Sequence, residues 1–124
     1  MARSRKSDAE PDLPTEQEAA TYDRLFPMLV AAHHEMGELS KKKQDGVLNP
    51  LKIRNINRLL AELQKLLEKD PSRNFVELLD EDTLPQNSDV VLLLSQWRAA
   101  LEQYKRRHSA KYGGWRTVEN PGVE

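Results

Sequence analysis

The sequence predicts an all-α fold, a small antiparallel helical bundle of three main helices plus a short helical turn. Two observations support this prediction. Apolar residues recur every three or four positions in three long segments, a spacing that keeps their side chains on one face of a helix. Capping residues and prolines mark the ends of these segments, and the linkers between them are short.

The chain has 124 residues, which suits one domain with a single modest core. It contains no cysteine, and this excludes disulfides, thiolate metal sites and thiol catalysis, so packing alone must hold the fold. We expect a helical bundle domain over residues 14–112. Residues 1–13 should form a disordered tail because they offer almost no apolar side chains to bury, and residues 113–124 should form a flexible tail after a glycine pair.

The first helix should begin after Thr15, because Thr15 and Glu18 match a capping box, in which each side chain accepts from the other residue's backbone amide. Its apolar stripe consists of Tyr22, Leu25, Leu29, Ala32, Met36 and Leu39. Pro27 interrupts the stripe and predicts either a kink over residues 23–26 or a helix that restarts there. The pair Asp45–Gly46 should end the helix.

The second helix should begin with Asn49 as its cap and Pro50 in its first turn, and should end near Lys69, before Asp70–Pro71. Its apolar seam is the clearest in the chain, made by Ile53, Ile56, Leu60, Leu63 and Leu67 and broadened by Leu59 and Leu66. The opposite face carries a basic stripe of Arg54, Arg58, Lys65 and Lys69.

A short helical turn is expected over residues 72–79, with Phe75, Val76 and Leu79 buried, and an acidic loop should follow over residues 80–87. The last helix should start with Asn87 or Ser88 as its cap. Its seam consists of Val90, Leu93, Trp97, Ala100 and Tyr104. Because the stripes of these helices are wide, a homodimer is an alternative to a monomer, since it would bury apolar surface that one chain leaves uncovered.

The N-terminal basic residues are not followed by the apolar stretch of a secretory signal, and no apolar run reaches the ~20 residues of a membrane helix. We therefore expect a cytoplasmic protein without membrane contact. The net charge is −1, so no global field would draw the molecule to nucleic acid. The charge is nonetheless uneven, because residues 41–73 are rich in Lys and Arg, whereas residues 74–97 contain acids but neither Lys nor Arg.

Residues 35–39, Glu-Met-Gly-Glu-Leu, resemble the acidic helix motif of the MazG-type all-α nucleotide pyrophosphohydrolases. The resemblance implies that Glu35 and Glu38 would hold magnesium, with Glu77 and Asp80 as the family's second acidic pair. The chain departs from the family where His34 replaces a usual glutamate and where the second pair comes late. Solvated acids on an amphipathic helix account for the same pattern, and we predict no metal or other cofactor.

A second alternative is nucleic-acid binding. The basic stripe of the second helix and the C-terminal residues Arg106 and Arg107 could neutralise phosphates, and Tyr104, Tyr112 and Trp115 are interleaved with this C-terminal cluster. The sequence contains no helix-turn-helix, zinc-finger or sheet-based RNA-binding signature, however. Trp115 lies beyond two glycines and is a candidate docking residue if its tail is exposed.

No serine has a base and an oxyanion arrangement around it, and no Gly-rich loop follows a strand, so we do not expect an enzyme. The leading hypothesis is a non-enzymatic helical protein-interaction module, an accessory or regulatory protein with a protein partner. The candidate binding residues are Arg54, Arg58, Lys65, Lys69, Asp80, Glu81, Asp82, Arg106, Arg107 and Trp115.

Overall fold

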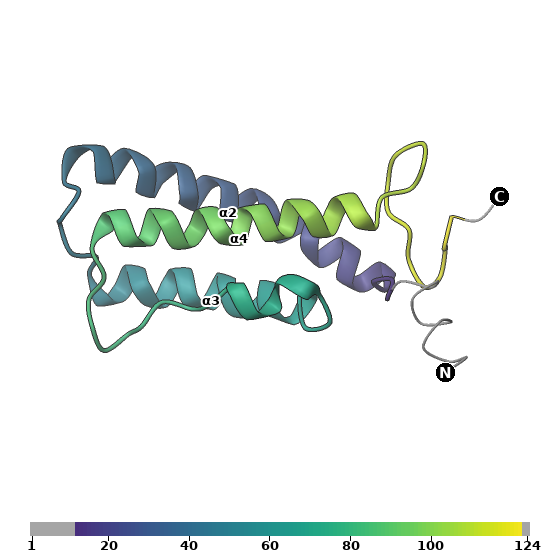
Figure 1. The fold of residues 1–124 in the computed structure, drawn as a ribbon, viewed down its shortest axis with the longest axis horizontal. Helices are drawn as coiled ribbons and strands as arrows, with labels where there is room; N and C mark the ends of the chain where they lie inside the picture. Colours follow the sequence, from purple (N-terminus) through teal and green to yellow (C-terminus); the bar gives the residue numbers. More distant parts are fainter. Residues whose placement is uncertain (1–11, 123–124) are drawn as a thin grey trace.

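The computed structural model describes residues 12–122; residues 1–11 and 123–124 of the two expected tails lie outside this range. Its three long helices confirm the all-α prediction: α2 spans Glu16–Lys42, α3 spans Pro50–Leu66 and α4 spans Asn87–Arg107. A short 3-10 helix, η1, covers Pro71–Phe75. Figure 1 shows the three helices lying side by side in an elongated bundle. Within residues 12–122, no helix combines the length and the apolar character needed to cross a bilayer.

The predicted capping box begins α2. The Thr15 hydroxyl accepts from the Glu18 amide at 3.0 Å, and the Glu18 carboxylate accepts from the Thr15 amide at 2.9 Å. The helix then continues through Pro27 as far as Lys42, so it does not restart at the proline. Pro27 is exposed, which places its ring on the solvent side of the helix.

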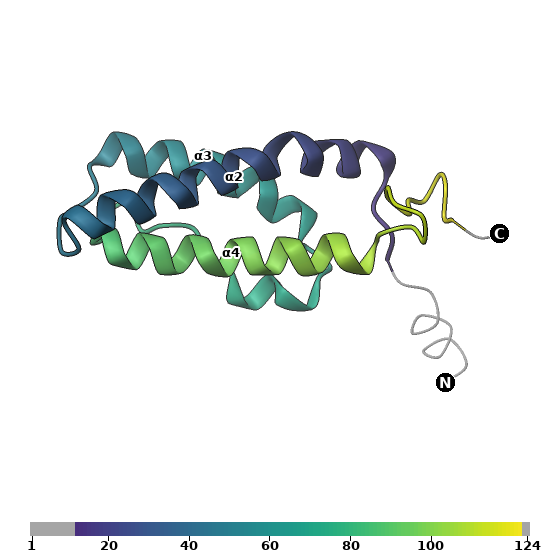
Figure 2. The ribbon, with the colours of Figure 1, turned by 90° about the horizontal axis from the view of Figure 1, so that it is seen from above.

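The direction of the helices refines the expected antiparallel arrangement. Figures 1 and 2 show that α2 runs antiparallel to both of its neighbours, whereas α3 and α4 run in the same direction. An isolated bridge between Val47 and Gln86 joins the N-terminal ends of α3 and α4, and an ion pair between Asp70 and Arg107 joins their C-terminal ends. The parallel pair arises because residues 76–86, here called the crossover, return along the bundle instead of making a short turn.

Buried hydrogen bonds hold the crossover in place. The Asn57 side chain, 6% exposed, donates to the Leu79 carbonyl at 2.8 Å and accepts from the Leu79 amide at 2.7 Å. From the other side, the Trp97 indole donates to the Glu77 carbonyl at 2.7 Å. These bonds satisfy backbone groups that have no helical or strand partner, which is why an irregular segment can pass between helices.

Two helix boundaries differ from those expected, and η1 covers Pro71–Phe75 where a turn over residues 72–79 was expected. The α3 helix ends at Leu66 rather than near Lys69, and Asp70 instead caps η1 by accepting from the Ser72 amide at 3.0 Å. The last helix begins at Asn87 after Gln86 as its cap residue, because the Asn87 side chain donates to the Lys43 carbonyl at 2.8 Å, at the end of α2.

The prediction that Phe75 is buried is wrong. Val76 and Leu79 are buried as expected, but Phe75 is 75% exposed. The 3-10 helix ends at Phe75 and the backbone becomes extended at Val76, and adjacent side chains point to opposite sides of an extended backbone. Burying Val76 therefore turns Phe75 toward solvent.

One core joins the helices and the crossover. Most of its largest fully buried side chains come from the expected seams: Leu29 of α2, Ile53, Leu60 and Leu63 of α3, and Val90 and Trp97 of α4. Leu94 and Leu101 of α4, which lie beside the expected seam, are also fully buried, whereas the seam residue Leu93 is only partly buried. Leu67 and Leu48, which flank α3, are buried with them. The seams predicted from the spacing of apolar residues thus meet in a common interior.

Candidate functional site

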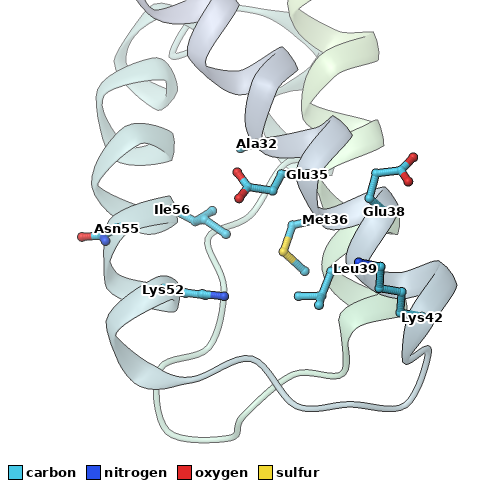
Figure 3. A pocket seen from close by; sticks show the side chains of 9 residues that line it. All are labelled: Ala32, Glu35, Met36, Glu38, Leu39, Lys42, Lys52, Asn55 and Ile56. Atoms are coloured by element: carbon cyan, nitrogen blue, oxygen red, sulfur yellow. The ribbon is translucent and has the colours of Figure 1, made fainter.

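A groove of about 350 Å³ separates the C-terminal half of α2 from the N-terminal half of α3. Ala32, Met36 and Leu39 of α2 face Ile56 of α3 across it, as Figure 3 shows. A water molecule occupies about 30 Å³ of liquid volume, so the groove has room for several apolar side chains. An apolar hollow of this size on a helical surface is a candidate docking site.

Charged side chains border the groove: Glu35, Glu38 and Lys42 on α2, and Lys52 on α3. Glu35 of α2 and Lys52 of α3 reach into the space from opposite sides, whereas Asn55 points away from it (Figure 3). Both Glu35 and Lys52 are exposed, and neither takes part in an ion pair among the described residues. The groove therefore presents a free negative group and a free positive group on facing helices.

The remaining acid of the groove is engaged along its own helix. Glu38 accepts from Lys41 at 3.2 Å, and the hydrogen bond and charge of Lys41 lower the pKa of this carboxyl group. Exposed pairs of this kind contribute little to stability because water screens them. Because Glu38 is already paired with Lys41, Glu35 is the carboxylate of the α2 wall that remains free to bind a partner.

The four acids that the pyrophosphohydrolase resemblance names are spread over two elements. Glu35 and Glu38 lie on α2 beside the groove, and Glu77 and Asp80 lie in the crossover. Asp80 accepts from the Asp82 amide at 2.9 Å, a contact that lowers the pKa of its carboxyl group. Across the part of the chain that the structure describes, no three His, Asp or Glu residues gather in a group able to hold a metal ion.

The basic stripe of the second helix is solvent-facing. Arg54, Arg58 and Lys65 are exposed on α3, and Lys69 is exposed just beyond its end. Lys65 pairs with Glu62 at 3.3 Å, one turn away on the same helix. The stripe lies on the side of α3 opposite its buried seam, so these side chains remain accessible to a ligand.

The three acidic candidate residues are all exposed, but one of them also forms a hydrogen bond that holds the fold. Asp80 and Asp82 are exposed in the crossover. Glu81 is also exposed, but its carboxylate accepts from the Asn57 side chain at 3.2 Å. Because Asn57 also holds the Leu79 backbone, Glu81 contributes to fixing the crossover.

Arg106 and Arg107, two candidate binding residues, are both exposed, but Arg107 is engaged in an ion pair within the fold. The Arg107 guanidinium donates to Asp70, whose side chain is 3% exposed. Burial alone would raise the pKa of Asp70, but hydrogen bonds from Ser72 and Arg107 outweigh burial, and the pKa is lowered. Arg107 therefore compensates a buried carboxylate and links the ends of α3 and α4.

Trp115 was expected on a flexible tail, but the structure packs this part of the C-terminal segment against α2 and α4. The indole ring meets the Tyr22 ring edge-on at 4.9 Å between centroids, donates to Asp23 at 3.0 Å and lies 4.0 Å from the Lys105 ammonium group. Thr117 is 4% exposed. Apolar aromatic surface thus outweighs the flexibility of the glycine pair, and Trp115 belongs to the packing of the bundle.

Sequence reasoning missed Lys42, Lys52 and Asn55 as residues of the groove. It assigned the apolar lining residues to stripes: Ala32, Met36, Leu39 and Ile56. A stripe indicates which side chains turn inward, but not whether a neighbouring helix comes close enough to cover them. The available signal is the small Ala32 between larger stripe residues, since a small side chain leaves space that its neighbours must fill.

Comparisons with protein-family models, with curated proteins and with solved structures gave no match to this chain.

Proposed function

We propose that this chain is a non-enzymatic protein-interaction module that docks apolar side chains of a protein in the groove between α2 and α3. The observation that carries this proposal is the groove itself, which is lined by Ala32, Met36, Leu39 and Ile56 and bordered by charged side chains. Protein interfaces combine an apolar centre with a polar rim in the same way.

Recognition by helical proteins often uses such a groove, because an amphipathic segment can insert side chains one turn apart between two helices. The apolar stripe supplies the driving force, since each methylene removed from water contributes about 0.8 kcal/mol. Met36 lies at the base of the groove and is flexible, so it can adapt its shape to an incoming side chain.

The proposal is tested by filling the groove. Ala32→Trp places a large ring in the space, whereas Ala31→Trp adds the same ring at the neighbouring position of α2, which is exposed. Both variants and the parent chain are used as bait after nuclease treatment, and the retained proteins are compared by mass spectrometry. We expect Ala32→Trp alone to lose the proteins, including further copies of this chain, that bind through the groove.

Identical retention by the two variants contradicts the proposal, and so does the absence of any retained protein. Circular dichroism and urea unfolding of both variants show whether the helical content and stability are preserved. Ala31→Trp controls for a general effect of an added tryptophan.

A second candidate function is nucleic-acid binding, which is favoured by the exposed row of Arg54, Arg58 and Lys65 on α3. The Asp70–Arg107 pair links the C-terminal ends of α3 and α4, and Arg106, beside Arg107, is also exposed. We would measure fluorescence anisotropy of labelled single-stranded RNA and DNA at rising salt. Binding that weakens steeply with salt and is lost in Arg54→Glu/Arg58→Glu supports this candidate, whereas salt-insensitive binding rules it out.

A further inference from the structure

Two of the four charged side chains that line the groove, one on each wall, form a pair that can be matched between two copies of the chain. Glu35 stands on the α2 wall and Lys52 on the α3 wall, and both reach into the space between the helices (Figure 3). Symmetric dimers form through surfaces of this type, because each contact between two residues occurs twice with the roles exchanged. We propose that the occupant of the groove is a second copy of this chain, docked groove to groove about a two-fold axis.

The orientation of that axis follows from the placement of the charges. A two-fold axis that runs along the groove sets α2 of each copy over α3 of the other copy. Glu35 then faces the partner subunit's Lys52, and Lys52 faces the partner subunit's Glu35. An axis across the groove would instead set α2 over α2 and bring two carboxylates together, which repel each other.

The same docking covers apolar side chains that the single chain leaves accessible. Leu39 and Ile56 are only partly buried, and the hollow between them has a volume of about 350 Å³. Docking of the opposing copy would remove these partly buried side chains from water, which supplies the driving force. The two charge pairs at the centre would fix the register and the orientation of the copies.

This inference rests on the proposed function because it uses the same groove, and it predicts a specific response to charge reversal. Glu35→Lys makes positions 35 and 52 both positive, and Lys52→Glu makes both positions negative. Each variant should repel itself. In an equimolar mixture, however, every facing pair between the two variants is again one positive and one negative group, so the mixture should associate.

The mixture separates pairing between chains from pairing within one chain. If Glu35 and Lys52 acted only within a chain, each variant would carry a like-charged pair that mixing cannot correct. Both positions are exposed, so neither reversal disturbs the core. Glu68→Lys is the matched control, since Glu68 is an exposed acid that follows α3 at the end distant from the groove.

The experiment is sedimentation equilibrium over a concentration series at low ionic strength, with a monomer mass of 14.3 kDa as the reference. We expect the parent chain and Glu68→Lys to form dimers. We expect Glu35→Lys and Lys52→Glu each to weaken self-association at least about tenfold, and their mixture to recover it. Native mass spectrometry of the mixture, with one variant isotope-labelled, should show the mixed dimer as the main species.

Two results would overturn the inference: a parent chain that stays monomeric throughout the series, or a dimer that survives both single reversals unchanged. Either result leaves the proposed function to be judged separately. If Ala32→Trp loses a different protein while the parent chain remains a monomer, the groove binds a heterologous partner and only the self-docking inference fails.

Discussion

The two halves of α2 meet their neighbours in different ways. In the N-terminal half, Tyr22 stacks on Phe26 at 5.0 Å and on Tyr104 of α4 at 6.1 Å, and Trp115 closes the cluster. In the C-terminal half, beyond Pro27, the groove separates α2 from α3. One continuous apolar stripe is therefore covered by aromatic rings at one end of the helix and left accessible at the other.

The two halves of α2 are packed differently because the side chains that cover them differ in size and come from different parts of the chain. The aromatic end receives a ring from the C-terminal segment, which is distant in sequence, and aromatic rings bury large areas. The groove end has Ala32 in its wall, and α3 supplies Ile56 opposite it. We place the proposed docking site at the C-terminal half of α2, because a fully packed region has no room for side chains of a partner.

The largest expected effect comes from truncating one buried residue in each half. Tyr22 and Met36 are both 5% exposed, so burial alone does not distinguish them. Tyr22→Ala removes three aromatic contacts and the hydrogen bond from its hydroxyl to the Leu101 carbonyl at 3.0 Å. We expect a loss of about 4 kcal/mol for Tyr22→Ala and about 2 kcal/mol for Met36→Ala, at the low end for such truncations.

Urea unfolding of both variants measures this difference. Each should unfold in a single transition with an unchanged slope against urea concentration, so that the midpoints report stability. Equal losses for the two variants would contradict the comparison, since they would mean that the groove half is as tightly packed as the aromatic half.

A smaller effect is expected at Trp115, which closes the aromatic half. Trp115→Ala removes the contacts to Tyr22 and Lys105 and the hydrogen bond to Asp23, and we expect a loss of about 2 kcal/mol. Tyr112→Ala is the control, because Tyr112 is 86% exposed and should change stability by less than about 0.5 kcal/mol. Thermal unfolding followed by circular dichroism compares the two, and a Trp115 variant as stable as its control would show that the C-terminal segment does not close the bundle.

The elements of this fold were largely predictable from local signals. The Thr15–Glu18 capping box and the Asn49–Pro50 start act over a few neighbouring residues, so the sequence displays them directly. The seams that carry Leu29, Ile53 and Trp97 were predicted for the same reason, since a period of 3.6 residues defines a helical face.

The crossover, the aromatic cluster and the groove depend on contacts between distant residues. The buried Asn57 does not interrupt the apolar spacing of the second helix, so the sequence gives no sign of its role. The structure shows that its side chain holds the Leu79 backbone. The glycine pair before Trp115 predicted a flexible tail, because glycine is a local signal that the sequence displays. The packing of the indole ring depends on residues far away in the sequence, so the sequence does not display it. The apolar side chains that line the groove were predictable from the stripes, but the width of the groove was not, because it depends on how closely α2 and α3 pack.

A smaller effect than that of Trp115→Ala is expected from lowering the pH, which loosens the aromatic end through His108. His108, at the end of α4, is 5% exposed and meets the Tyr104 ring edge-on at 4.9 Å. Its Nδ1 atom is buried without a hydrogen-bond partner among the described residues. The pKa of His108 is lowered, chiefly by burial and further by the charges of Arg107 and Arg116, with Asp70 and Asp12 acting in the opposite direction.

The lowered pKa of His108 determines whether the free energy of unfolding rises or falls with pH. In the unfolded chain the histidine pKa is near 6.5, so below about pH 6.5 the unfolded state binds a proton that the folded state does not. The free energy of unfolding therefore falls as the pH drops through this range and on through the folded pKa. We expect this loss to be smaller than that of Trp115→Ala.

The measurement compares unfolding midpoints at pH 7.5 and pH 5.5 for the parent chain, His108→Gln and His34→Gln, the last being an exposed control on α2. The pH dependence should be reduced in His108→Gln and unchanged in His34→Gln, and the part that remains comes from His33, whose pKa burial also lowers. Hydrogen exchange should locate the loosening in residues 104–117, while the groove residues of α3 stay protected. Equal loosening in both regions would show that the two halves of α2 unfold as one unit, because protonation at one end would then release the packing of the other.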